Sequence, residues 1–145
     1  MASKDHGIIV VGVDGSEESV AALEWAVAEA RLREAKVEAI MALDTPWTIM
    51  FSGSYTESDY AEDARKLLDE TVSGVIAKHP DVTITQSFVP RKPGLALIEA
   101  AQEADLLVVG SHGPGAIPGM HLGSVANFCV NRSPIPVVVH RTPEK

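Results

Sequence analysis

The feature that most limits the possible folds is a regular alternation of short apolar runs with longer helical segments. The apolar runs, rich in β-branched residues, occupy residues 8–13, 37–43, 82–89, 106–109 and 136–139. The first helical segment begins after Ser16, which is expected to cap it, and the others occupy residues 59–78, 93–104 and 124–131. Within 59–78, the apolar residues at helical spacing are expected to face the core: Ala64, Leu67, Leu68, Val72, Val75 and Ile76. Strands that alternate with helices form parallel sheets with right-handed connections. The pattern therefore predicts an α/β fold: a doubly wound, five-stranded parallel sheet with helices on both faces and strand order 3-2-1-4-5.

Length and composition limit the number of domains, the partners and the compartment that we expect for this fold. A length of 145 residues suits a single domain over residues 1–145. The formal net charge of −8 does not attract nucleic acid or an anionic membrane, so neither is expected as a partner. The single cysteine, Cys129, excludes an internal disulfide and shares a helical stripe with Val125 and Phe128, which predicts a core position. A reducing compartment and the absence of a signal-peptide pattern lead us to expect a cytoplasmic protein.

The topology also predicts where a ligand binds. In doubly wound sheets, ligands bind beyond the carboxyl ends of the strands, at the point where the winding reverses. Here that point lies between the first and fourth strands. The first strand ends in Val13-Asp14-Gly15-Ser16, and the fourth leads into a glycine-rich segment. Asp14 either contacts a ligand or caps the turn into the first helix.

The glycine-rich segment predicts an anion site. It runs Gly110-Ser111-His112-Gly113-Pro114-Gly115-Ala116-Ile117-Pro118-Gly119-Met120-His121-Leu122-Gly123-Ser124, from a buried strand into a helix. Glycine permits close approach of the backbone, and successive N–H groups together with a helix start can bind phosphate. The alternative is a plain surface loop. The absence of lysine excludes a Walker A motif, and the absence of an acid after the next strand disfavours a dinucleotide.

Side chains in this segment allow several roles. Ser124 is a helix N-cap, a phosphate contact or both. Ser111 and His112 are adjacent, so we expect their side chains to point apart and not to form a nucleophile–base pair. His112 and His121 have no third ligand at a recognisable spacing, so no metal site is expected.

At this point the sequence resembles a known family. The spacing Gly110-x₂-Gly113-x₉-Gly123-Ser124 is similar to the nucleotide-binding signature of the universal stress protein family. The early Val11-Gly12-Val13-Asp14-Gly15-Ser16, the strand end Ala42-Leu43-Asp44 and the closing Ser133-Pro134-Ile135-Pro136-Val137-Val138-Val139 also resemble that family. The resemblance extends over nearly the whole chain.

The resemblance implies a site for ATP, with Mg²⁺ held by the phosphates. Asp14 would contact the nucleoside, and the backbone of Ala42 would lie near adenine. The glycines would shape the phosphate cradle, and Ser124 and Val125 would meet the terminal phosphates. The full predicted set is Gly12, Val13, Asp14, Ala42, Gly110, Ser111, His112, Gly113, Pro114, Gly115, Gly123, Ser124 and Val125.

Three positions depart from the pattern of the resembled family. His112 replaces a frequent arginine, Pro114 replaces a common basic residue and removes an N–H donor, and Ala126 replaces a frequent hydroxyl residue. These changes weaken the phosphate side of the predicted site.

The leading functional hypothesis is an ATP-binding sensor or regulator in stress adaptation. The alternatives are a slow ATP hydrolase, for which only His112 offers a base near the phosphates, and a nucleotide-free dimerisation module. The run Pro136-Val137-Val138-Val139 is strongly β-forming and last in the sheet. It predicts an edge strand through which two copies form a homodimer.

Overall fold

The computed structural model describes residues 7–44, 46, 49, 53–113 and 122–142. Strands and helices alternate in the predicted order. They are β1 (Ile8–Gly12), α1 (Glu17–Arg33), β2 (Lys36–Ala42), α2 (Glu57–Lys78), β3 (Ile84–Val89), α3 (Pro93–Ala101), β4 (Leu106–Gly110), α4 (Ser124–Arg132) and β5 (Val137–His140). Ser16 is the N-cap of α1, as predicted: its side chain accepts a hydrogen bond from the backbone of Ser19.

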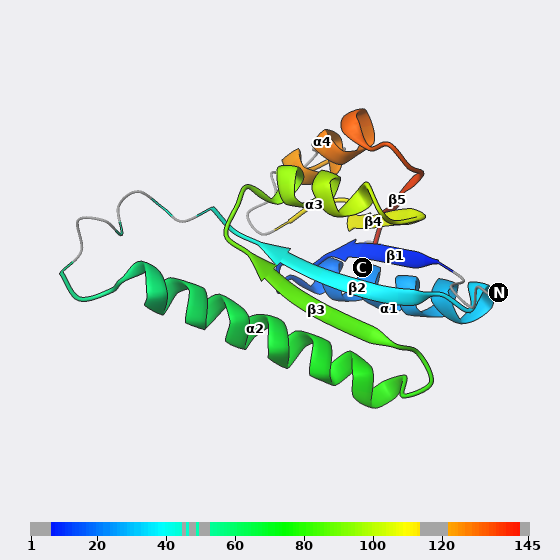
Figure 1. Ribbon diagram of the computed structural model, residues 1–145, viewed down its shortest axis with the longest axis horizontal. Helices are drawn as coiled ribbons and strands as arrows, with labels where there is room; N and C mark the ends of the chain where they lie inside the picture. The colour runs from blue at the N-terminus through cyan, green and yellow to red at the C-terminus, as the bar shows by residue number, and fades with distance from the viewer. Residues whose placement is uncertain (1–6, 45, 47–48, 50–52, 114–121, 143–145) are drawn as a thin grey trace.

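The five strands form one sheet in the order β3-β2-β1-β4-β5, and every pairing is parallel (Figure 1). This confirms the predicted fold class and strand order. β1 pairs with both β2 and β4, for example through Val11, which lies opposite Ala39 and Val108. The winding therefore reverses between β1 and β4, and the carboxyl ends of these two strands lie side by side.

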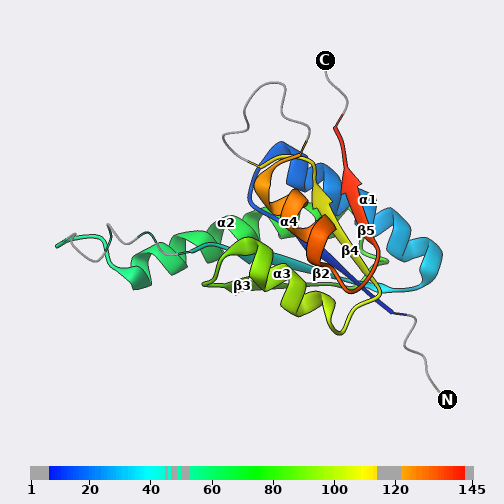
Figure 2. The same ribbon diagram turned by 90° about the horizontal axis from the view of Figure 1, so that it is seen from above.

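Helices α1 and α2 cover one face of the sheet, and α3 and α4 cover the other (Figures 1 and 2). One buried cluster joins Leu23 of α1 and Leu68 of α2 to the sheet, and the other joins Leu97 of α3 and Cys129 of α4. Successive residues of β1 and β4 enter opposite clusters, because neighbouring side chains on a strand point to opposite faces. This burial on both faces explains why the two central strands are continuously apolar.

Helix α2 differs from the prediction at its start and along its apolar face. It begins two residues earlier than expected, because Thr56 and Asp59 form a reciprocal capping box with hydrogen bonds of 3.0 and 3.1 Å. Leu67 and Ile76, which were predicted to face the core, are 43% and 39% exposed. The buried stripe is narrow and consists of Ala64, Leu68, Val72 and Val75.

Two observations bear on the predicted compartment. Cys129 is buried, as predicted, and burial raises the pKa of its thiol to about 11, which disfavours the reactive thiolate. In the described part of the chain, no helix has the length and apolar character needed to cross a bilayer. The cytoplasmic location itself stays a prediction.

The turn between β1 and α1 depends on a glycine, which a pair of substitutions can test. Gly15 has a φ of +86°, and an added Cβ would lie 2.8 Å from Leu67 Cδ2. We expect Gly15→Ala to lower the free energy of unfolding by about 1–2 kcal/mol. Gly74→Ala is the matched control: inside α2, its Cβ would meet no described atom within 4 Å. It should raise stability by about 0.5–1 kcal/mol.

Urea unfolding followed by circular dichroism measures both variants. Destabilisation of similar size in the two would contradict the left-handed turn at Gly15.

Candidate functional site

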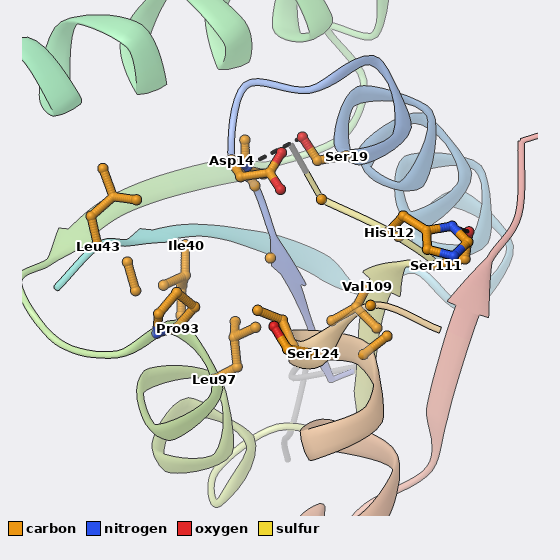
Figure 3. A pocket seen from close by; sticks show the side chains of 18 residues that line it. Asp14, Ser19, Ile40, Leu43, Pro93, Leu97, Val109, Ser111, His112 and Ser124 are labelled. Carbon is orange, nitrogen blue, oxygen red and sulfur yellow. Dashed lines mark hydrogen bonds between the residues drawn. The ribbon is translucent and has the colours of Figure 1, made fainter. Parts of the chain in front are cut away.

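A cavity of about 370 Å³ lies at the carboxyl ends of the central strands (Figure 3). Its size lies within the usual range for small-molecule sites. Every predicted site residue that the structure describes contributes to its lining: Gly12, Val13, Asp14, Ala42, Gly110, Ser111, His112, Gly113, Gly123, Ser124 and Val125. Pro114 and Gly115, also predicted, lie outside the described residues. His121, which was considered from the sequence as a metal ligand, also lies outside the described residues.

Asp14 caps the turn after β1 and also faces the cavity. Its Oδ1 accepts a 2.9 Å hydrogen bond from the Ser16 N–H, and its own N–H donates to Ser19 Oγ at 3.2 Å. The capping role considered from the sequence is therefore confirmed. The second carboxylate oxygen, Oδ2, lies against Gly113, where an added Cβ would approach it to 2.9 Å. One oxygen thus holds the turn, and the other lies beside the glycine-rich segment.

Glu18, an acidic residue in the first turn of α1, is an important residue near the site that no motif in the sequence identifies. At Gly110, an added Cβ would lie 3.4 Å from the backbone of Glu18, so glycine permits this close approach of α1 to β4. The Glu18 carboxylate accepts hydrogen bonds from Ser111 Oγ at 3.0 Å and from the His112 N–H at 3.3 Å. No local pattern relates positions so far apart in sequence, so only the fold reveals this contact.

The prediction that Ser111 and His112 point apart is wrong. Ser111 Oγ lies 3.2 Å from His112 Nδ1, and Figure 3 shows the two side chains side by side. The cause is Glu18, whose carboxylate accepts from both residues. The geometry differs from that of a catalytic triad in two ways. The Ser111 hydroxyl donates to Glu18 instead of to the histidine. The Glu18 carboxylate lies 3.8 Å from His112 Nδ1, which is the same nitrogen that faces Ser111, whereas in a triad the acid and the serine contact different ring nitrogens.

The first turn of α4 supplies backbone donors. The N-cap is Gly123, whose N–H donates to the Ser111 carbonyl at 2.6 Å, so the alternative that Ser124 caps the helix is wrong. Ser124 is instead the first helical residue, with an exposed side chain at the cavity. The first intrahelical bond comes from Asn127 to the Gly123 carbonyl. The N–H groups of residues 124–126 therefore lack intrahelical partners at the positive end of the helix dipole.

The opposite side of the cavity is apolar, and most of its residues were missed in the sequence. Figure 3 shows the side chains that gather there: Ile40, Leu43, Pro93 and Leu97. Val109 and Ser19 also line the cavity and were not predicted. Ala126 lines it as well, although the sequence identified this residue only as a departure from the family pattern. These positions lie at strand ends and helix starts around the predicted switch point, so topology rather than a motif identifies them.

Ala42 presents backbone groups to the cavity. The Ile40 carbonyl accepts a 2.8 Å hydrogen bond from the Val13 N–H, so the backbone of Ile40 points toward β1. Backbone groups two residues apart on a strand point to the same side, and those of Ala42 therefore also face the β1 side. Because β1 ends at Gly12, they face the cavity instead of a neighbouring strand.

The electrostatic character of the cavity is acidic. Asp14 lies in the lining and Glu18 directly behind it, whereas the described lining includes neither lysine nor arginine. The sequence from 110 to 126 contains no lysine or arginine at all. Among the described residues, the N–H groups in the first turn of α4 and the positive end of its dipole are features that favour an anion.

These features define a Rossmann-like α/β protein with a glycine-lined cavity at the switch point of its sheet. The model of the universal stress protein family matches residues 6–141, and the chain belongs to this family. A universal stress protein of Mycobacterium tuberculosis is 38% identical over 151 aligned residues, which cover 99% of this chain and 46% of that protein. The chain thus spans less than half the length of that curated relative.

Solved structures agree with the family assignment. A crystal structure of a universal stress protein in complex with cAMP is 31% identical, with a TM-score of 0.69 and coverage of 94% of this chain and 97% of that one. A universal stress protein from Archaeoglobus fulgidus is 25% identical, with a TM-score of 0.67 and coverage of 91% of both chains.

The two cavity glycines should respond differently to a methyl group. At Gly123, an added Cβ would lie 3.2 Å from His112 Cα and 3.3 Å from the Ser111 carbonyl, so backbone would have to move. We expect Gly123→Ala to lower the free energy of unfolding by about 1–2 kcal/mol. Gly113→Ala meets a carboxylate oxygen that can rotate away, so its cost should stay below about 1 kcal/mol.

Chemical denaturation of both variants measures the difference. A greater loss in Gly113→Ala than in Gly123→Ala would contradict this assignment of the close contacts.

Proposed function

We propose that the cavity binds an adenine nucleotide, ATP among them, and that the chain acts as a nucleotide-dependent sensor or regulator in stress adaptation. The observation that carries the proposal is the two-sided cavity. An apolar half with backbone groups of Ala42 facing the cavity adjoins a polar half at the first turn of α4. Such a combination suits a flat heterocyclic base joined to a phosphate.

Each part of the ligand has matching groups in this proposal. Adenine packs among Ile40, Leu43 and Leu97, and the Ala42 backbone forms hydrogen bonds with the polar edge of the base. The free Asp14 oxygen accepts hydrogen bonds from ribose hydroxyls, as carboxylates do. The phosphate lies at the α4 N-terminus, with Ser124 and Val125, and any Mg²⁺ is held by phosphate oxygens.

Family membership and the relative crystallised with cAMP support the proposal. We further propose that residues 1–145 work as one such domain. Hydrolysis is the weaker alternative. His112, the residue considered as a base, faces Ser111 and Glu18 with its Nδ1, and this contact does not favour an attack on phosphate.

Calorimetric titration tests the binding proposal. We expect ATP to bind with a Kd in the micromolar range or weaker, because the phosphate side lacks cations. Binding should also raise the melting temperature, since a ligand of the native state adds RT ln(1 + [L]/Kd) to stability. Gly113→Ala should weaken binding about tenfold by displacing the Asp14 carboxylate. The remote Gly74→Ala is the matched control and should leave the Kd unchanged.

The binding proposal fails if none of the four compounds ATP, AMP, cAMP and adenosine gives a heat signal or a shift in melting temperature at millimolar concentration.

We also propose that β5 forms a homodimer contact. It lies at the edge of the sheet and pairs with β4. The Pro136 and His140 carbonyls accept from Leu107 and Ser111 of the β4 side, so even-numbered residues of β5 direct their backbone groups toward β4. Val137 and Val139 therefore direct theirs to the outer edge, where a second copy of β5 can pair with them.

Val139→Pro tests this contact. It removes an outward N–H while leaving the β4 side intact, a position where proline is tolerated in an edge strand. The control Val139→Ala shortens the side chain but keeps the N–H. Light scattering at micromolar concentration should give twice the 15.4 kDa chain mass for the parent and the alanine variant, and the monomer mass for the proline variant. A monomeric parent protein would refute the proposal.

A further inference from the structure

We propose that Leu67 of α2 is a positioning residue for the cavity: it holds the turn after β1 so that the Asp14 carboxylate faces the ligand. Leu67 acts on the proposed adenine-nucleotide site, on which this inference rests, from a helix that contributes no residue to the described lining. Three observations carry the proposal: the contact of Leu67 with Gly15, the conformation of Gly15 and the hydrogen bonds of the turn.

Leu67 covers Gly15 at the turn between β1 and α1. A Cβ added at Gly15 would lie 2.8 Å from Leu67 Cδ2, 3.3 Å from its Cγ and 3.5 Å from its Cδ1. The isobutyl group therefore occupies the side of the glycine where a side chain would stand. Leu67 lies outside the buried stripe of α2 and is 43% exposed, so its contact with the turn gives this leucine a role that the sheet does not.

The conformation of Gly15 decides where the next N–H group points. Gly15 has a φ of +86°, and a glycine without side-chain contacts adopts positive and negative φ about equally. In the observed conformation the Ser16 N–H donates to Asp14 Oδ1 at 2.9 Å, while Asp14 Oδ2 lies beside Gly113. A change of φ at Gly15 would turn the Ser16 N–H away and release the carboxylate. Because Leu67 packs on Gly15, it disfavours that change.

Helix α2 is itself held in place beside the turn. Leu68, next to Leu67 in the chain, belongs to the buried stripe that packs α2 on the sheet. At the far end of the helix, the C-cap residue His79 contacts α1: its Nε2 lies 2.6 Å from Glu24 Oε1. Since α2 is fixed by these contacts, the side chain at position 67 decides whether the turn is covered.

The test is NMR titration of the isotope-labelled full chain with adenosine and with adenine. Leu67→Ala should weaken adenosine binding about three- to tenfold, because a carboxylate that is free to rotate forms a weaker hydrogen bond to the ribose. It should change adenine binding less than about twofold, since adenine has no ribose for Asp14 to contact. Ile76→Ala is the matched control, because Ile76 is 39% exposed on the same helix and lies about 13 Å further along its axis. It should change both Kd values less than about twofold.

A second readout needs no nucleotide. Hydrogen exchange of the Ser16 N–H, measured by NMR on the same samples, should be about three- to tenfold faster in Leu67→Ala, because its hydrogen bond to Asp14 opens more often. Exchange should be unchanged in Ile76→Ala. Leu67→Met keeps an apolar side chain of similar volume and should restore both the adenosine affinity and the slow exchange.

The outcomes separate this inference from the proposed function. If the parent protein binds neither adenosine nor adenine, the adenine site is overturned, and the exchange of the Ser16 N–H alone decides on Leu67. Equal adenosine affinity of Leu67→Ala and the parent protein overturns the positioning role and leaves the adenine site standing. Unchanged exchange at Ser16 in Leu67→Ala overturns it as well. Equal effects of Ile76→Ala, or an equal loss of adenine binding, also overturn it, because a general loss of stability would then be the cause.

Discussion

The parallel pairing of β1 with β4 is the interaction on which the rest of the structure depends. Both strands are buried on both faces, so this pairing forms the centre of two apolar clusters at once. It also brings together two turns that are nearly a hundred residues apart in sequence. The Asp14 turn and the segment after Gly110 become neighbours only because their strands end at the same edge of the sheet. Long-range strand pairing, rather than any local motif, therefore creates the cavity.

Most of the architecture could be predicted because it depends on patterns within short segments. Apolar runs too short for helices, separated by segments with helical periodicity, leave few options besides a parallel sheet. The failures are of a different kind. Leu67 and Ile76 were assigned to the core by spacing alone, yet the sheet surface under α2 accommodates only a narrow stripe. The width of a buried face depends on the partner element, which periodicity within one helix does not report.

The candidate site likewise contains residues that local sequence patterns identify and residues that only the fold identifies. The glycine positions and Asp14 were found from the sequence because they belong to the turns themselves, whereas Ile40 and Leu97 become site residues only through the fold. The error at Ser111 and His112 is informative. Adjacent residues on an extended segment do tend to point apart, but that expectation omits a third group. Here the carboxylate of Glu18, on another element, accepts from both residues and sets their orientation.

Glu18 therefore links the shape of the site to its electrostatics. In an acidic protein an anion site built from backbone N–H groups needs a backbone held in a fixed conformation, and the hydrogen bonds to Glu18 provide that fixation at Ser111 and His112. The same carboxylate adds a negative charge beside the donors it organises. A neutral acceptor would hold the segment with weaker hydrogen bonds, since charged acceptors form the stronger ones. In the proposed site, the carboxylate that fixes the orientation of Ser111 and His112 thus also opposes the approach of an anionic group.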